Sequence, residues 1–150
     1  MVNPKELRIS NYLYDEDGAI IKINGFAPHS HSTRCDEEEG CVILFDIYGQ
    51  DGNIRQGYEN ESSNCNPIEL TPEWLGRCGF MQENNAWHIN KPLSYTEAYF
   101  SLFDNNLCKG NLDLQLNGSY YMLLPRIKYV HQLQNIYYFL SGEELTIKTD

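Results

Sequence analysis

A helix predicted over residues 129–140 constrains this chain more than any other stretch of its sequence. At about 100° per residue, its apolar side chains fall into a single continuous arc. The members of this arc are Tyr129, Val130, Leu133, Ile136, Tyr137 and Leu140. Gly142 then ends the helix, because glycine adopts the left-handed conformation without a steric penalty. No good N-cap residue precedes the helix, so we expect the chain to pass directly from a strand into it.

The opposite arc of this helix is polar but carries no formal charge, in a chain whose net charge is −10. Its members are His131, Gln132, Gln134, Asn135 and Tyr138, with Phe139 as the one apolar exception near the edge. Uncharged polar groups can be buried once they are hydrogen-bonded, whereas solvated helix faces usually carry Lys and Glu. The arc therefore packs on another part of the same chain, which is the more common arrangement, or forms a recognition surface. The five polar residues are our candidate partner- or ligand-binding residues.

The first part of the chain predicts two β-hairpins. Alternating and apolar runs indicate strands, and an Asp-Gly turn separates the two runs of each pair. The predicted strands span residues 7–14 and 19–24 in the first hairpin, and residues 42–48 and 53–58 in the second. Short hairpins of this kind tend to close into a small barrel or a curled sheet. We therefore expect residues 1–66 to form a β-hairpin lobe that resembles a small barrel.

The second half of the chain combines short strands with helices. Thr71, Pro72 and Gly79 predict a helix of about two turns, because they suit its N-cap, its first position and its stop. Strands are predicted over residues 87–90, 95–103, 112–116, 119–124 and 145–148. We expect residues 67–150 to form an α+β lobe in which one amphipathic helix packs on a sheet. The predicted fold class is α+β with mostly antiparallel strands, and the alternative to two lobes is one compact domain.

Composition limits the partners that this chain could bind. The 11 basic residues are scattered among 21 acidic ones, which disfavours direct binding to nucleic acid. No apolar run approaches the roughly 20 residues of a membrane span, and the N-terminus lacks the apolar segment of a signal peptide. Five cysteines at irregular spacings indicate free thiols rather than a disulfide framework. These features predict a cytoplasmic protein that makes no contact with a membrane.

One loop contains residue types that bind metals. His29, His31, Cys35 and Cys41 are zinc-ligand types, but their spacing fits none of the usual paired patterns. We therefore treat them as weak candidates and expect no bound metal or other cofactor. The chain also lacks a nucleophile elbow, a glycine-rich phosphate loop and a His-Glu-x-x-His motif. No catalytic residue is predicted, although a small metal-dependent or hydrolytic enzyme remains the alternative.

Three stretches of the chain carry a resemblance to a known family. Residues 67–75 with Gly79 and Phe80 resemble a PI-LT-EWL---GF signature. Residues 127–135 and 141–145 resemble an IKYVHQLQNLY…TGEEL ending, and residues 7–11 are similar to an LRIGN start. Together these stretches are similar to small uncharacterised proteins of Bacteroides-type bacterial genomes, their phages and their mobile elements. The resemblance implies a genomic setting and no established activity. Where that pattern tends to have Gly, this chain has Ser10.

The sequence therefore favours a non-enzymatic binding or accessory protein of phage or mobile-element origin. The missing catalytic motifs, the uncharged helix face and the resemblance all point this way. A sharper form of the hypothesis is counter-defence, in which the protein sequesters a host protein or a signalling nucleotide. The expected partner is thus a host or phage protein, or a small nucleotide ligand. The sequence leaves the oligomeric state open.

Overall fold

A computed structural model describes residues 2–28, 41–48, 54–61, 64–84, 86–92, 99–104, 112–116, 120–122 and 127–148. The chain divides into two compact units. Unit 1 comprises Met1–Ile68 with Thr149–Asp150, and unit 2 comprises Glu69–Lys148. From the sequence we expected two lobes, residues 1–66 and 67–150. That division into domains stays a prediction. Both units combine short elements around antiparallel sheets, which confirms the α+β fold class.

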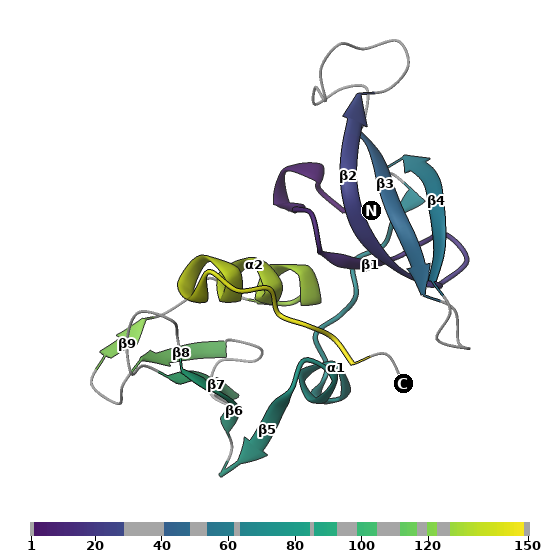
Figure 1. Cartoon of the computed structure of the whole chain (residues 1–150). Coiled ribbons are helices and arrows are strands. Elements are labelled where there is room, and N and C mark those ends of the chain that lie inside the picture. Colours follow the sequence, from purple (N-terminus) through teal and green to yellow (C-terminus); the bar gives the residue numbers. More distant parts are fainter. Residues whose placement is uncertain are drawn as a thin grey trace. The chain divides into compact units, whose positions relative to one another are not determined.

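Unit 1 is built around a four-stranded antiparallel sheet with the strand order β1-β2-β3-β4 (Figure 1). A single 3₁₀ turn, η1 (Pro4–Glu6), precedes the sheet. The strands are β1 (Tyr12–Tyr14), β2 (Ile20–Pro28), β3 (Cys41–Tyr48) and β4 (Ile54–Glu61). Each strand pairs with its neighbour in sequence, so the sheet is the meander that the two predicted hairpins imply.

The sheet of unit 1 curls without closing into a barrel. The pairing of β2 with β3 skips Asn24, and the pairing of β3 with β4 skips Gly57. Such bulges bend a strand and increase its twist. Among the described strands β4 does not pair with β1; instead the N–H groups of Tyr14 and Asn66 each donate to the other residue's carbonyl, at 2.9 and 2.8 Å. In place of the small barrel expected from the sequence, the structure has a curled open sheet. One bridge, between Tyr14 and Asn66, joins β1 to the chain after β4.

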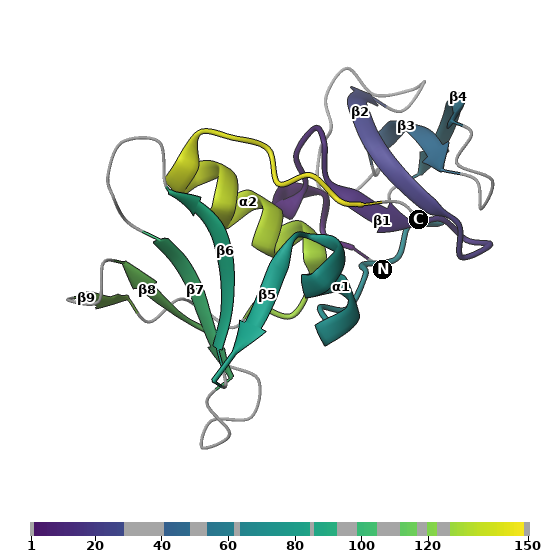
Figure 2. The ribbon, with the colours of Figure 1, turned by 60° about the horizontal axis from the view of Figure 1, so that its bottom comes forward.

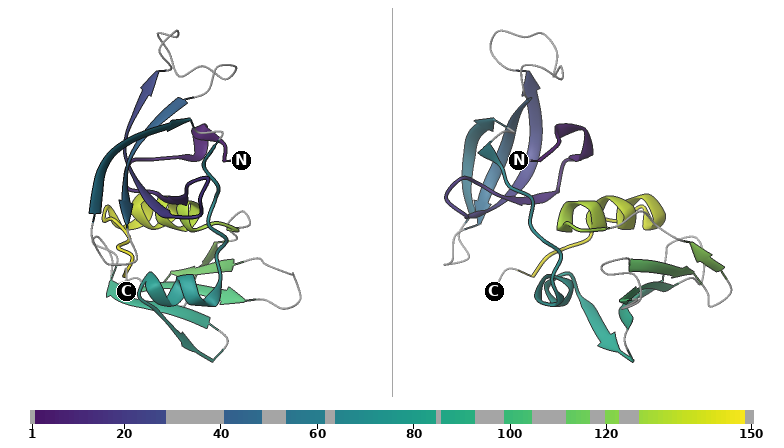
Figure 3. Two further views of the ribbon diagram at one scale, coloured as in Figure 1. Left: turned by 90° about the vertical axis from the view of Figure 1, so that its right-hand side faces the viewer. Right: turned by 180° about the vertical axis from the view of Figure 1, so that it is seen from behind.

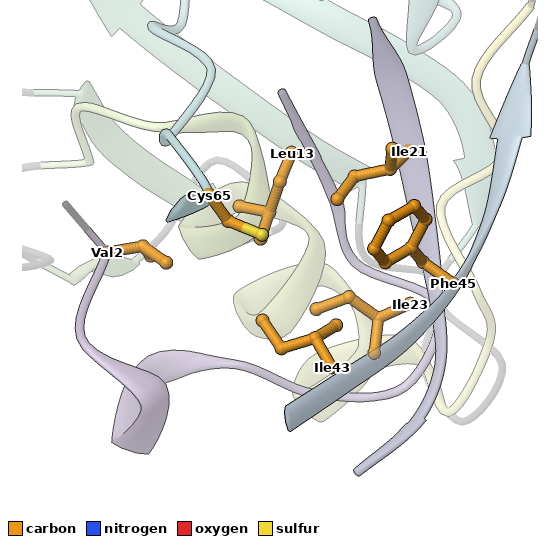
Figure 4. Close-up of a cluster of buried hydrophobic side chains, with 7 residues drawn as sticks. All are labelled: Val2, Leu13, Ile21, Ile23, Ile43, Phe45 and Cys65. Carbon is orange, nitrogen blue, oxygen red and sulfur yellow. The ribbon is translucent and has the colours of Figure 1, made fainter. Parts of the chain in front are cut away.

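The core of unit 1 lies on one face of this sheet (Figure 4). Alternate residues of the strands point into it, as the period of two requires. Its buried members are Val2, Leu13, Ile21, Ile23, Ile43, Phe45 and Cys65. Cys65 is a free thiol, and burial is the main reason why its pKa is raised to about 11. The packing of this face follows directly from the alternation seen in the sequence.

The first hairpin turns at Asp15, as predicted. One carboxylate oxygen of Asp15 accepts from the N–H groups of Asp17 and Ala19, at 3.0 and 2.7 Å. Gly18 has a φ of 82°, which an L-residue rarely adopts. The turn therefore has two separate requirements. Asp15 supplies a side-chain acceptor at its start, and Gly18 takes a left-handed conformation near its end.

The chain before β1 forms a tight turn where a strand was predicted over residues 7–14. The N–H of Asn11 donates to the carbonyl of Arg8 at 3.1 Å, and the Asn11 side-chain oxygen accepts from the Arg8 N–H at 2.8 Å. Ser10 occupies the third position of this turn with a φ of 74°. This is the position at which the LRIGN pattern has Gly, which takes a positive φ without strain. The prediction was wrong for residues 7–11 because an alternating pattern does not reveal the backbone angle at Ser10.

Replacing Ser10 by Gly should stabilise the protein relative to replacing it by Ala. A left-handed L-residue costs roughly 1–2 kcal/mol, and the extra chain entropy of Gly costs roughly 0.5–1 kcal/mol. We therefore expect Ser10→Gly to exceed Ser10→Ala in unfolding free energy by about 1 kcal/mol. Urea titration of both variants checks this, and both lack the hydroxyl group. Equal stabilities would show that the backbone at Ser10 is not strained.

Unit 2 is built around a five-stranded antiparallel sheet with the order β5-β6-β7-β8-β9. The strands are β5 (Phe80–Glu83), β6 (Ala86–Pro92), β7 (Tyr99–Asp104), β8 (Leu112–Leu116) and β9 (Tyr120–Met122). The helix α1 (Pro72–Arg77) precedes the sheet, and α2 (Val130–Ser141) follows it. Figure 2 shows α2 lying across one face of this sheet. A sheet packed by one amphipathic helix was the arrangement expected from the sequence.

The short helix α1 begins and ends as the sequence predicts. The hydroxyl oxygen of Thr71 accepts from the Trp74 N–H at 3.3 Å, and Pro72 is the first helical residue. Gly79 follows the helix with a φ of 83°. Trp74 of this helix is buried. Phe80, the first residue of β5, is buried as well. The chain is thereby turned from α1 directly into the sheet.

Two strand assignments in unit 2 differ from expectation. No strand was predicted at β5, because the residues after Phe80 show no alternation of apolar and polar side chains; the structure exposes all three of them. The strand predicted over residues 145–148 is wrong: this segment is irregular, with Leu145 and Ile147 buried and Thr146 and Lys148 exposed. Its two-residue period reflects burial of alternate side chains and not membership of a sheet. Residues 117 and 118, which separate the predicted strands over 112–116 and 119–124, lie outside the described residues.

Candidate functional site

Tyr129, the N-cap residue before α2, is extended, with φ −126° and ψ 150°. Tyr129 forms an isolated bridge with Glu69, so the chain enters the helix from an extended residue, although not from a strand. The side-chain oxygen of Gln132 accepts from the N–H groups of Lys128 and Tyr129, at 3.0 and 3.3 Å. A glutamine at the third helical position thus reaches back over the helix start, as in one half of a capping box. One of the five candidate binding residues therefore has a structural role.

The C-terminal end of α2 is acidic. The N–H of Gly142 donates to the Tyr138 carbonyl at 2.8 Å, and Gly142 has a φ of 72°, as expected for the stop. The last turn contains no basic residue, and the exposed Glu143 and Glu144 follow it. The end of a helix already carries a partial negative charge, so these carboxylates add to the potential and do not offset it. This end of α2 therefore attracts cationic groups.

The five candidate residues on α2 differ widely in exposure. His131 and Gln134 are buried, with 1% and 0% of their surface exposed. The His131 ring stacks on that of Tyr129, with 5.6 Å between centroids. Gln132 and Asn135 are half-buried, and Tyr138 is 41% exposed. The uncharged arc is therefore divided between a buried part and an accessible part.

The accessible part of this arc also includes Phe139, which is not one of the five candidate residues. Phe139 is 86% exposed, more than any other large hydrophobic residue described. Its position inside the polar arc was the available signal, and it was treated as an exception to the pattern. We define the α2 surface as Gln132, Asn135, Tyr138 and Phe139, which combine two amides and two aromatic rings. This surface is the first candidate site.

Removing the Gln132 amide should destabilise the protein without affecting the exposed aromatic residues. We expect Gln132→Ala to lower the unfolding free energy by about 1 kcal/mol, because two N–H groups at the helix start lose their acceptor. Gln132→Glu keeps the acceptor and places a negative charge at the favourable end of the helix. Thermal or urea unfolding of both variants checks this. If both lose the same stability, the cap does not act through the side-chain oxygen.

The four metal-ligand candidates lie in or next to a part of the chain outside the described residues. His29, His31 and Cys35 lie outside the described residues, and of Cys41 only the backbone at the start of β3 is described. Within the described part of the chain, no three His, Cys, Asp or Glu residues gather as metal ligands. The weak assignment of these four residues as metal ligands therefore stays a prediction.

Unit 2 also contains a pocket of about 260 Å³, which none of the five candidate residues lines. It lies where the end of α1, the strand β6 and the helix α2 meet the segment that follows α2. The lining residues are Arg77, Cys78, Gly79, Ile89, Tyr137, Glu144, Leu145, Thr146 and Lys148. Figure 3 shows the C-terminal segment running from α2 back to α1, where the Lys148 N–H donates to the Arg77 carbonyl at 2.9 Å. We call residues 143–148 the C-terminal strap.

The titratable groups in the pocket are not those of a nucleophilic site. Burial raises the pKa of the free Cys78 thiol to about 12, so the thiol stays protonated at neutral pH. Burial also raises the pKa of Tyr137, with a further contribution from Glu143. The guanidinium of Arg77 is paired with Glu73 at 3.2 Å and lies 5.0 Å from the centre of the Trp74 ring. Cys78 and Tyr137 are therefore neutral at neutral pH, and the charged lining residues are Arg77, Glu144 and Lys148.

The raised pKa of Cys78 predicts a loss of stability in alkali. The thiol ionises in the unfolded chain at its ordinary pKa near 9 but in the folded chain only at about 12. Its contribution is therefore complete below pH 9 and is lost as pH rises from about 9 to 12, by up to roughly 1.4 kcal/mol per pH unit. We expect the unfolding free energy of Cys78→Ala to fall less steeply over this range. Denaturant titrations at several pH values check the slope, and a parallel fall in both proteins would contradict it.

Two of the three stretches that carry the family resemblance come together in unit 2. The Leu70 N–H donates to the Lys128 carbonyl at 2.8 Å, next to the bridge between Glu69 and Tyr129. Farther along, Gly79 and Leu145 line the same pocket. Sequence motifs that are far apart in the chain therefore contribute to one place in the structure.

Comparisons with known proteins add no further constraint. No protein family, curated protein or solved structure matches the chain. None of the helices in the described ranges has the length and apolar character needed to cross a membrane. The function is therefore argued from the two candidate sites.

Proposed function

We propose that this chain is a non-enzymatic binding or accessory protein that binds a partner protein through the α2 surface. The observation that carries the proposal is the exposure of Phe139, at 86%, next to Tyr138 at 41%. Single exposed hydrophobic residues are common, but adjacent aromatic residues beside uncharged amides are typical of protein interfaces. The helix itself contains no charged residue, although the chain has a net charge of −10. Such a face loses little solvation energy when a partner covers it.

The shape and charge of the α2 surface favour a basic protein as the partner. The face of a helix is convex, whereas nucleotides and other small ligands bind in concave sites. The pocket of about 260 Å³ is smaller than the roughly 300–1,000 Å³ of sites for drug-sized ligands, so it also argues against a nucleotide. Glu143 and Glu144 extend the surface with negative charge at the negative end of the helix. A partner with basic groups around an apolar contact would complement both features.

The resemblance to proteins of phages and mobile elements extends this proposal to a host protein as the target. A protein that binds without catalysis can act by sequestering its partner, which is the counter-defence form of the hypothesis. The protonated Cys78 supports binding over nucleophilic chemistry at the pocket. Phage plaquing on hosts with and without defence systems tests this form, and equal plaquing across a broad panel would remove it.

Replacing Phe139 by Gln should weaken partner binding strongly while changing stability very little. The ring is exposed, so we expect the unfolding free energy to change by no more than about 0.5 kcal/mol. A central aromatic residue in an interface contributes about 2 kcal/mol or more, so the dissociation constant should rise at least roughly 30-fold. Pull-down from host lysate, followed by titration of the purified partner, measures both effects.

Met81→Gln provides the matched control for this experiment. Met81 is 55% exposed on β5 and is likewise a large hydrophobic residue of unit 2, but it does not belong to the α2 surface. We expect the Met81 variant to retain its partner with the affinity of the wild type. If Phe139→Gln and Met81→Gln behave alike, whether both bind or both fail, the α2 surface is not the binding site.

A further inference from the structure

The pocket of unit 2 has an apolar interior. Its walls include four buried side chains, those of Cys78, Ile89, Tyr137 and Leu145. A buried apolar interior with a few polar groups at its edge is the usual composition of a small-molecule site. The pocket is therefore suited to a ligand whose body is apolar.

The size of the pocket limits the ligand to a small molecule. An engineered apolar cavity of about 150 Å³ holds benzene, so about 260 Å³ has room for a single ring or a branched aliphatic chain with a small polar group. Drug-sized ligands occupy sites of roughly 300–1,000 Å³. The volume thus defines a narrow class of ligand.

The charged residues that line the pocket do not favour a charged ligand. The guanidinium of Arg77 is paired with Glu73 at 3.2 Å, and Glu144 already has an interaction within the chain. Lys148 is exposed to water. An ion pair with an exposed lysine contributes little, because water screens it, whereas moving an ionised group from water into apolar surroundings is costly. The balance favours an uncharged ligand, which leaves the existing contacts of Arg77 and Glu144 in place.

Thr146 supplies a neutral polar group at the edge of the pocket. It lines the pocket from the C-terminal strap and is exposed, whereas its neighbours Leu145 and Ile147 are buried. Thr146 makes no hydrogen bond with another residue of the described ranges. A threonine hydroxyl group can both donate and accept a hydrogen bond. A hydroxyl group on the ligand can therefore pair with Thr146 without displacing a contact in the described part of the chain.

We infer that this pocket binds a small uncharged alcohol. Its single ring or branched aliphatic chain lies among Cys78, Ile89, Tyr137 and Leu145, and its hydroxyl group pairs with the hydroxyl of Thr146. The C-terminal strap supplies both Leu145 and Thr146, so the ligand also holds the strap in place. This site is separate from the α2 surface and does not depend on the proposed function.

Calorimetry and thermal unfolding of the full chain at pH 7 test this inference with four probes. Benzyl alcohol has one ring and a hydroxyl group, benzylamine and benzoate carry a positive and a negative charge on the same ring, and 2-naphthalenemethanol adds a second ring. We expect saturable binding and a rise in Tm with benzyl alcohol, and at least about fivefold weaker binding of the other three probes. A charged or fused-ring probe that binds as tightly as benzyl alcohol, or no saturable response to benzyl alcohol, would overturn the assignment.

Replacing Thr146 by Val tests the polar contact, because valine keeps the shape of the side chain and removes its hydroxyl group. We expect the Kd for benzyl alcohol to rise about two- to tenfold, the range expected when one neutral hydrogen bond is lost. Toluene lacks the hydroxyl group and is the matched control ligand, so its Kd should be the same for the variant and the wild type. An unchanged Kd for benzyl alcohol, or an equal rise for both ligands, would refute the contact with Thr146.

The two buried cysteines allow a readout that does not depend on this substitution. Cys78 lines the pocket, whereas Cys65 lies in the core of unit 1. We expect saturating benzyl alcohol to slow alkylation of Cys78 by iodoacetamide at least about threefold at pH 9 while Cys65 is unaffected, as measured by peptide mass spectrometry. Unchanged alkylation of Cys78, or equal slowing at both residues, would contradict binding in the pocket.

Discussion

Main-chain contacts join the segment before α1 to the segment before α2, and most of unit 2 is arranged around them. The bridge of Glu69 to Tyr129 and the hydrogen bond from Leu70 to Lys128 hold the chain before α1 beside the chain before α2. Both contacts join main-chain atoms, so they fix position without depending on particular side chains. The sheet lies between these two points in the sequence, so its five strands are enclosed by a pair of segments that meet. The pocket depends on the same connection, because α1 and α2 form two of its walls.

Elements with clear start and stop signals could be predicted from the sequence. The helix expected over residues 129–140 is α2 within one residue, and Thr71, Pro72 and Gly79 bound α1 as expected. In these cases one local feature, a cap or a left-handed glycine, decides the boundary. The errors arose where a two-residue pattern was the only signal. Residues 7–11 form a turn around a left-handed serine, and residues 145–148 bury alternate side chains without a partner strand.

The sequence predicted on which side of α2 the candidate residues lie, but not how deeply each of them is buried. Helical periodicity placed His131, Gln134, Asn135 and Tyr138 on one arc, yet the structure buries the first two and exposes Tyr138. A helical wheel gives the direction of each side chain around its own axis, and what covers that direction depends on contacts distant in sequence. The pocket could not be predicted from the sequence for the same reason. Its lining comes from four separate segments, and only their meeting in space identifies them.

The C-terminal strap has a consequence for the kinetics of unit 2. Within the described residues, Leu145, Thr146 and Ile147 make no backbone hydrogen bond, and the strap is tied back to α1 at Lys148. Such a segment can detach by local unfolding at a free energy far below that of the whole domain. Detachment would bring Leu145 out of the interior and open a path to Cys78. Any molecule that enters the pocket would then associate at a rate set by this opening, and its residence time would be set by how tightly the strap closes again.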